Sequence, residues 1–460
     1  MLESFRNIFN VPDLRNRILF MFGLLAVYRI GCYIPTPGID PRALLEFMQL
    51  TEGTIFGFVN TFTGGSLSRV AVFSLGIMPY ITASIILQLL TVVWPYLEKL
   101  SKEGELGRRK ITQYTRYGTI VISIIQSLGI AFFLQKVTTP GGGQLVPDPG
   151  LGFVLMTVIT LTTGTAVVMW LGEQISERGI GNGISLIIFA GIVVGLVPAI
   201  IDTIGRVRNE SLNAVAMVLL VVFMTVVVAF IVYMERAQRR IPVQYAKRVV
   251  GRRIYGGQST YLPLRVNTGG VIPVIFASSV VMIPVTVASM IQVEWLQTLS
   301  AYFAWGTPLY YVIYGSMIIF FSYFYVSIIF NPTDLAENMR KYGGFIPGIR
   351  PGKRTAEYID RILTRVTLVG ALYLAAVSIL PEFLLAGFKI NQVPFLGPRI
   401  DAYVPTWVTE GMGIQFYFGG TSLLIVVGVA MDTIQQIESQ LVMRNYEGFM
   451  KRGRIRGRRG

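Results

Sequence analysis

Few side chains in this sequence could carry out chemistry. The chain has no histidine, and its one cysteine, Cys32, lies within an apolar run. The absence of histidine excludes Ser-His-Asp and Cys-His catalysis, histidine-ligated metal sites and histidine proton relays. A single cysteine also excludes an internal disulfide.

Acidic side chains are scarce where apolar runs would cross a membrane. Asp202 and Asp432 lie toward the ends of such runs, and Glu382 follows Pro381 near the end of another. A charge at the bilayer centre costs about 2.5–3.5 kcal/mol on insertion scales, and ion-coupled transporters need such groups near the midplane. No two carboxylates form a visible pair. We therefore predict no proton or ion coupling and no enzymatic activity.

Nucleotide binding is also not expected. The nearest approach to a phosphate-binding loop is the segment 348–354, GIRPGKR. A P-loop needs four residues between its glycines and a Ser or Thr after the lysine. Here three residues separate Gly348 from Gly352, and Arg354 follows Lys353. We expect no cofactor.

The composition indicates a polytopic helical membrane protein. The 460 residues are 53% hydrophobic and 14% charged, against about 25% charged residues in soluble domains. The mean hydropathy is +0.58. The formal charge of +15 favours the retention of Lys and Arg in cytosolic loops, and it is also compatible with binding to nucleic acid or an acidic partner.

The elements that would position any functional residue are about ten apolar spans. We place them at 18–34, 73–94, 118–134, 153–171, 184–201, 214–233, 271–291, 309–330, 366–385 and 421–434. Basic loops at 97–116, 235–265 and 331–365 alternate with loops almost free of Lys and Arg. The positive-inside rule then predicts that both termini are cytosolic.

An even number of spans allows two five-helix halves of opposite orientation. We divide the chain into an N-terminal half, 1–205, a C-terminal half, 206–443, and a basic cytosolic tail, 444–460. This architecture also suits an ion-coupled solute carrier with inverted repeats, although the missing midplane charges argue against that class. A purely structural membrane scaffold is a further alternative.

The stretch from Gly64 to Gln88 organises the expected fold. It begins polar and Gly-rich and becomes an apolar helical pattern from about Phe73. Irregular backbone is not tolerated against lipid, because its peptide groups would lack hydrogen-bond partners. We therefore expect the polar part to lie inside a protein-lined cavity.

Two pairs of isoleucines share a helical spacing. Ile81 and Ile85 lie four residues apart, and so do Ile188 and Ile192. By spacing alone these are ordinary lipid-facing or core residues. Small and polar neighbours such as Thr82 favour a second interpretation, a water-filled cavity with an apolar constriction that gates by dewetting.

The two longer basic loops carry turn and cap signals. Strand-like stretches flank Gly256–Gly257 and predict a hairpin-like projection. In the other loop, Asn331–Pro332 can begin a short helix that Gly343–Gly344 ends. Pro347 and Pro351 bracket Arg350, and a rigidly presented arginine suits docking to a carboxylate or phosphate. Topology retention alone would also account for the individual charges, but it does not explain the two prolines around Arg350.

Taken together, these features resemble the SecY family, the channel subunits of the bacterial protein-translocation complex. The resemblance covers nearly the whole chain. It rests on 35–38 (PTPG), 75–84 (LGIMPYITAS), 100–109 (LSKEGELGRR), 113–116 (QYTR), 179–185 (GIGNGIS), 239–253, 343–352 (GGFIPGIRPG) and 420–424 (GTSLL).

The resemblance implies an all-α channel with an hourglass pore between two inverted halves. The pore ring would consist of Ile81, Ile85, Ile188, Ile192, Ile275 and Ile425. A short helical plug would occupy 61–72, with Thr61, Phe62, Gly64, Gly65, Ser66, Leu67, Arg69 and Val70 as its residues. A side opening between the second and third spans and the seventh and eighth would release signal or transmembrane segments into lipid.

The resemblance also implies partners and a location. The cytosolic loops would dock the ribosome and the SecA motor ATPase through Lys247, Arg248, Arg252, Arg253 and Arg350. SecE and SecG would be the small membrane subunits, and signal peptides, nascent chains and the lipid bilayer the other partners. The expected location is the bacterial inner membrane.

Overall fold

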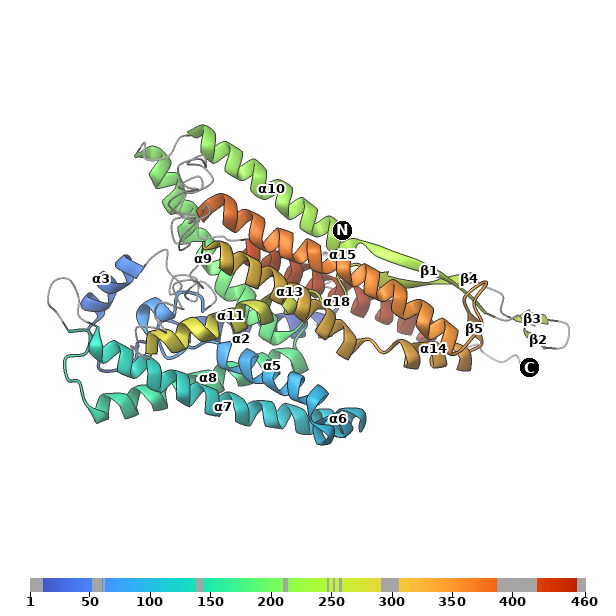
Figure 1. Cartoon of the computed structure of the whole chain (residues 1–460), viewed down its shortest axis with the longest axis horizontal. Coiled ribbons are helices and arrows are strands. Elements are labelled where there is room, and N and C mark those ends of the chain that lie inside the picture. Colours follow the sequence, from blue (N-terminus) through green and yellow to red (C-terminus); the bar gives the residue numbers. More distant parts are fainter. Residues whose placement is uncertain are drawn as a thin grey trace. The chain divides into compact units, whose positions relative to one another are not determined.

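The computed structural model is mainly helical (Figure 1). It describes residues 11–51, 60, 63–137, 144–209, 214–245, 248–250, 253–255, 259–290, 306–386 and 420–452. Contacts divide the chain into unit 1, Met1–Gly205 with Thr286–Gln297 and Val429–Gly460, and unit 2, Arg206–Val285 with Thr298–Gly428. The change of unit after Gly205 lies inside the helix Gly183–Arg208, and the last helix contributes to both units. Our division into two halves and a tail stays a prediction. The inverted relation of the halves stays a prediction.

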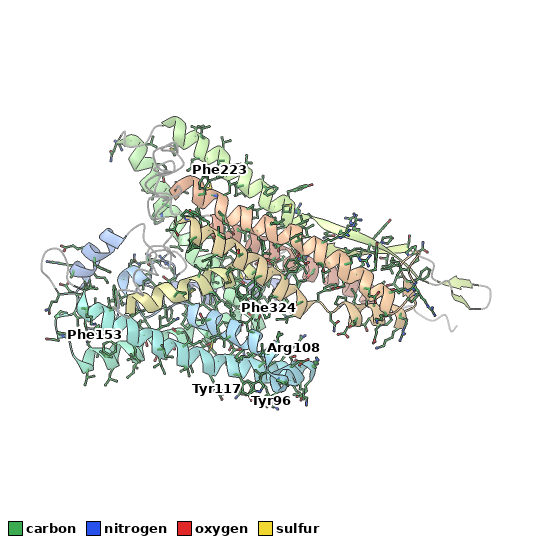
Figure 2. The ribbon with its side chains drawn as sticks, viewed as in Figure 1. Tyr96, Arg108, Tyr117, Phe153, Phe223 and Phe324 are labelled. Carbon is green, nitrogen blue, oxygen red and sulfur yellow. The ribbon has the colours of Figure 1, made fainter. Side chains whose placement is uncertain are left out.

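Unit 1 holds the helices of the first five expected spans. They are α2 (Pro12–Gly31), α5 (Met78–Val93), α7 (Glu105–Lys136), α8 (Leu151–Arg178) and α9 (Gly183–Arg208). Two shorter helices, α3 (Pro41–Thr51) and α6 (Pro95–Lys102), lie between them in the chain. Helix α7 packs along both α5 and α8 (Figure 1). Figure 2 shows Tyr96 and Arg108 toward one end of this group and Phe153 at the other.

Unit 2 holds the helices of the remaining spans. They are α10 (Ala214–Arg236), α13 (Pro308–Ile329), α15 (Lys353–Ala386) and the first parts of α11 (Ile272–Met290) and α18 (Gly420–Arg452). Helices α13 and α15 pack side by side, and the short α14 (Pro332–Lys341) lies against α15.

Within the described residues, seven helices are long and apolar enough to cross a membrane, or eight if the bent pair α5–α6 counts as one span. Helix α2 lies at the first expected span but carries Arg15, Arg17 and Arg29, and α11 contributes a shorter apolar stretch, Ile272–Val281. The expected count of about ten is compatible with these numbers.

Two expected boundaries were wrong. The helix of the second span begins at Met78 rather than at 73, because residues 73–77 form turns in which Gly76 has φ of +53°. The basic loop 97–116 is mostly helical, since it contains most of α6 and the start of α7. Pro95 lacks a backbone N–H and follows extended Trp94, so α6 bends away from α5 by 98°.

The expected hairpin is confirmed as strands β1 (Gln238–Tyr245) and β4 (Ser259–Arg265), antiparallel from Gln238↔Arg265 to Gln244↔Ser259. Strands β2 (Arg248–Val250) and β3 (Arg253–Tyr255) form a second antiparallel pair between them. The inner pair runs from Arg248↔Tyr255 to Val250↔Arg253. Gly256 and Gly257, where we expected the turn, lie outside the described residues.

Candidate channel site

In unit 1, four of the six expected ring residues are buried. Ile81 and Ile85 on α5 are 4% and 3% exposed, and Ile188 and Ile192 on α9 are 2% and 0% exposed. Ile86, the next residue along α5, is 45% exposed. The spacing therefore marks a protein-facing stripe of α5 rather than a lipid-facing one.

In unit 2, the other two expected ring residues are also buried. Ile275 lies on α11, where its carbonyl accepts the hydroxyls of Ser278 and Ser279, and Ile425 lies one turn into α18. A ring formed by all six isoleucines stays a prediction.

The expected plug segment, 61–72, was wrong in its conformation. Thr61 and Phe62 lie outside the described residues. From Thr63 to Val72 the described helical structure is a single 3₁₀ turn, Leu67–Arg69, and the rest consists mainly of turns. Gly64 and Gly65 have φ of +67° and +80°, which L side chains rarely adopt, so the backbone is not helical at these two residues.

Hydroxyl groups satisfy the backbone of this segment. The Ser66 hydroxyl lies 2.9 Å from the carbonyl of Thr63 and 3.0 Å from that of Phe73, and both carbonyls are within its reach as a donor. The Ser74 hydroxyl lies 3.1 Å from the carbonyl of Ser66. The Asn60 side chain accepts the amide of Ser68. Buried serines thus replace water as partners of a non-helical backbone.

The segment is also tied to the chain that follows α2. The amide of Val72 donates to the carbonyl of Ile34, and the amide of Thr36 donates to the carbonyl of Val70, which makes a bridge between Pro35 and Ala71. Val70 has φ of +39°, a strained value for a β-branched residue, which costs on the order of 1–3 kcal/mol.

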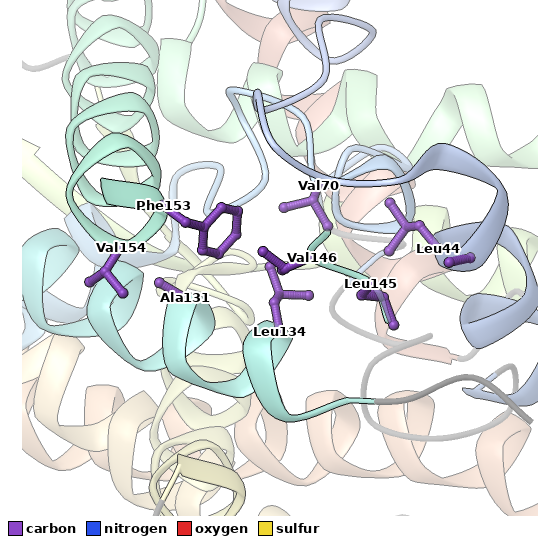
Figure 3. Packing of buried hydrophobic residues seen from close by; sticks show 9 residues of the cluster. Leu44, Val70, Ala131, Leu134, Leu145, Val146, Phe153 and Val154 are labelled. Atoms are coloured by element: carbon purple, nitrogen blue, oxygen red, sulfur yellow. The ribbon is translucent and has the colours of Figure 1, made fainter. Parts of the chain in front are cut away.

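The Val70 side chain is held in an apolar cluster (Figure 3). Its neighbours come from α3, from the facing ends of α7 and α8, and from the connection between them. They are Ala43, Leu44, Ala131, Leu134, Leu145, Val146, Phe153 and Val154. Burial among these residues offsets the backbone strain at Val70.

Two glycines let helices approach the segment closely. A β-carbon at Gly164 of α8 would overlap the carbonyl oxygen of Val72. One at Gly64 would lie 3.0 Å from the α-carbon of Gly191 on α9. Gly191 therefore serves contact with the segment, whereas a β-carbon at Gly195, one turn further along α9, would meet nothing within 4 Å.

In unit 2, the two basic loops form one structure. Strand β5 (Gly344–Phe345) pairs with β1 and completes a three-stranded sheet in the order β4-β1-β5. A shared apolar core contains Ile241, Val243, Leu264, Met339, Ile346 and Ile359. We did not predict this strand from the sequence, because a strand of only two residues is too short to show an alternation of apolar and polar side chains.

The expected docking residues are only partly described. Arg248 and Arg253 lie in β2 and β3, while Lys247 and Arg252 lie outside the described residues. Arg350 is exposed between Gly348 and Gly352, whose φ values are +79° and +108°. Its carbonyl accepts the Thr355 hydroxyl at 3.0 Å, which ties the loop to the start of α15.

Helix α14 begins and ends as expected. Asn331 caps it through the amide of Thr333, and Gly343 follows its end with φ of +72°. This helix, β5 and α15 fix both ends of the loop that carries Arg350.

Charged groups also link helices near the basic loops. Arg116 of α7 donates to the Glu173 carboxylate of α8 at 2.7 Å, just outside the expected spans. This bond raises the pKa of the Arg116 guanidinium. Sequence spacing could not reveal the pair, because the two residues are far apart in the chain.

A polar contact at the far end of α15 was not predicted. Glu382 is buried and accepts the Thr421 hydroxyl of α18 at 3.1 Å. The Tyr314 hydroxyl of α13 lies 3.0 Å from the same Thr421 oxygen. Three helices of unit 2 are thereby joined, and Thr421 lies one turn before Ile425.

Comparison with known proteins identifies the family. The SecY family matches residues 71–434. The protein translocase subunit SecY of Escherichia coli K12 is 50% identical over 449 residues, which cover 97% of this chain and 96% of the relative. The chain belongs to the SecY family. It is therefore a subunit of a channel-forming protein translocase and not an enzyme.

Solved structures agree with the SecY fold. A protein-conducting channel has a TM-score of 0.63 at 17% identity, covering 93% of this chain and 92% of that one. Sec61, in the canine ribosome–channel complex from the endoplasmic reticulum, has a TM-score of 0.58 at 16% identity over 93% and 92% of the two chains. At these identities the likeness shows the fold.

Replacing Gly164 with alanine should loosen the expected plug segment, because the new methyl group would overlap the carbonyl of Val72. We expect faster hydrogen exchange in peptides covering 63–77, measured by mass spectrometry. Gly152→Ala, on the same helix but with nothing within 4 Å, is the matched control. Equal exchange in both variants would show that the close approach does not hold the segment.

Proposed function

We propose that the chain passes unfolded secretory polypeptides through a constriction lined by Ile81, Ile85, Ile188, Ile192, Ile275 and Ile425, and releases signal or transmembrane segments sideways into lipid. The observation that carries this proposal is the burial of all six aliphatic side chains, which lie on α5, α9, α11 and α18. Membership of the SecY family, whose members are subunits of protein translocases, supports a polypeptide as the substrate.

An apolar constriction suits a sliding polypeptide. Aliphatic side chains offer no hydrogen bonds, so nothing holds an extended hydrophilic chain in place. An empty apolar constriction can also stop ions by dewetting. A signal sequence, with an apolar core of about 7–15 residues, leaves water only if the channel opens to lipid.

The plug segment would close the channel when it is idle. Its support is the buried backbone network around Ser66 and the contacts of Gly64 and Val72 with α9 and α8. A segment held by many weak contacts can be displaced without breaking a helix.

We further propose that both termini and the basic loops lie in the cytosol of a bacterium, with the chain in the inner membrane and SecE and SecG as its small subunits. The sheet β4-β1-β5 and the Arg350 loop would dock the SecA motor ATPase and the ribosome. The structural neighbour Sec61 is described in a complex with a ribosome, which supports the second partner. The two halves and the 444–460 tail remain the proposed domains.

A stalled secretory chain should crosslink to the constriction. With a photo-crosslinking residue at position 81 or 188, we expect covalent adducts of a stalled precursor on gels. The same probe at Val226, which is 60% exposed on α10, should give none above background. Equal yields at all three positions would contradict passage along the isoleucines.

Replacing Ile81, Ile85 and Ile188 with serine should make the resting channel leak ions, because hydroxyl groups favour a wetted pore. The measurement is the conductance of planar bilayers containing the full chain. Ile187→Ser is the control, since Ile187 is also buried but packs beside Gly172 of α8. A triple variant with the same ion conductance as wild type would contradict the assignment of these isoleucines to the constriction.

Arg350→Glu should weaken motor-driven export strongly, by about tenfold or more, because charge reversal replaces attraction to an acidic group with repulsion. Transport of a precursor into inverted vesicles and stimulation of the motor's ATPase measure this. Arg354→Glu makes the same charge change at an exposed position in the first turn of α15 and should cost less. Equal losses would argue for net charge rather than for the presented loop.

A further inference from the structure

Arg29 is a charged residue inside the first apolar run, where we would expect its side chain to reach for the membrane interface. In the structure it instead turns to the plug segment. One terminal nitrogen donates to the carbonyl of Gly64, and the other donates to the Tyr33 hydroxyl at 2.8 Å. A charged side chain within an apolar run is costly unless it has such partners.

Tyr33 is contacted by two arginines. The guanidinium carbon of Arg29 lies 4.6 Å from the centre of the Tyr33 ring, and that of Arg69 lies 4.2 Å from it. Arg29 belongs to α2 and Arg69 to the 3₁₀ turn of the plug segment. The ring therefore connects the helix to the segment through cation–π contacts.

We propose that Arg29, Tyr33 and Arg69 form a latch that holds the plug segment on α2 in the closed channel. This inference rests on the proposed function and adds to it the residues that set how readily the plug leaves. The fork of Arg29 bonds two acceptors at once, one on the segment and one on the ring, which a lysine could not do with the same geometry.

The position of Gly64 shows why the bond is specific. Its carbonyl meets Arg29, while its α-carbon faces Gly191 of α9, so the segment is held from two sides at one residue. Next to this point, the Tyr28 hydroxyl donates to the carbonyl of Thr63 at 3.3 Å, and the Tyr28 ring stacks on Phe73. The latch thus acts on a segment already fitted to α2.

Cys32, the only cysteine in the chain, reports on this contact. It is fully buried, and its sulfur lies 4.0 Å from the carbonyl of Thr63. When the plug segment leaves α2, this thiol becomes accessible. Its rate of alkylation therefore measures seating of the segment without any measurement of transport.

The test is the rate at which N-ethylmaleimide labels Cys32 in full-length protein in proteoliposomes, followed by intact mass. Arg29→Gln should speed labelling roughly ten- to a hundredfold, because a hydrogen bond to a charged group shifts an equilibrium by that order. Arg69→Gln and Tyr33→Leu should raise the rate by a smaller factor, and Tyr33→Phe, which keeps the ring, by less than Tyr33→Leu. Arg17→Gln, at the other end of α2, should label like wild type.

Wild-type rates in Arg29→Gln, Arg69→Gln and Tyr33→Leu would overturn the latch, as would equal acceleration in Arg17→Gln, which would show general loosening. Arg69 is exposed, so its variant tests the latch even if Arg29→Gln fails to fold. If the isoleucine variants leak ions but Cys32 in the Arg29, Arg69 and Tyr33 variants is labelled at the wild-type rate, the latch alone is refuted. If the isoleucine variants do not leak ions but Cys32 in the latch variants is labelled faster, the constriction is refuted and the latch remains as a structural contact.

Discussion

A peptide group that meets lipid without a hydrogen-bond partner costs several kcal/mol, and this constraint governs the segment between α3 and α5. The segment is neither helix nor strand over most of its described length, so each of its buried amides and carbonyls needs a partner from the protein. Ser66 and Ser74 supply hydroxyls, Asn60 supplies an amide oxygen, and Arg29 supplies a guanidinium. The helices around the segment accordingly present glycines, which let backbone approach backbone.

Because many short side chains supply the hydrogen bonds of the segment's backbone, the way in which the segment can move is affected. Many of the contacts that hold the described part of the segment are single hydrogen bonds, and Val70, whose positive φ is strained, is retained by surrounding apolar side chains. A segment of this kind can be stable in place and still be released as a unit. A continuous helix would be bound by cooperative internal bonds and would have to move as a rod.

Much of this arrangement could be predicted from the sequence, because hydropathy and turn chemistry are local. A helix lies within or across each expected span, and the α14 cap follows from the short stretch Asn331–Pro332. The hairpin and the family likewise follow from short stretches of sequence. The helical plug was wrong because the family analogy overrode Gly64 and Gly65, whose conformational freedom already argued against a helix. Strand β5 and the bonds of Arg29 and Glu382 depend on residues far apart in the chain, which no local pattern connects.

The intramembrane polar groups follow one rule. Glu382 is one of the residues for which the sequence raises the question of ion coupling, and Arg29 is the charged residue within the first apolar run. Both bind groups of their own chain: a backbone carbonyl and a tyrosine hydroxyl in the case of Arg29, a threonine hydroxyl in the case of Glu382. Each lies beside an element that carries the proposed conduction path, the plug segment or the start of α18 before Ile425. A channel for unfolded polypeptides of any sequence cannot place fixed charges where the chain slides, because each would attract some substrates and stall them. Charges can be used at such a depth to hold the walls, as Arg29 and Glu382 do.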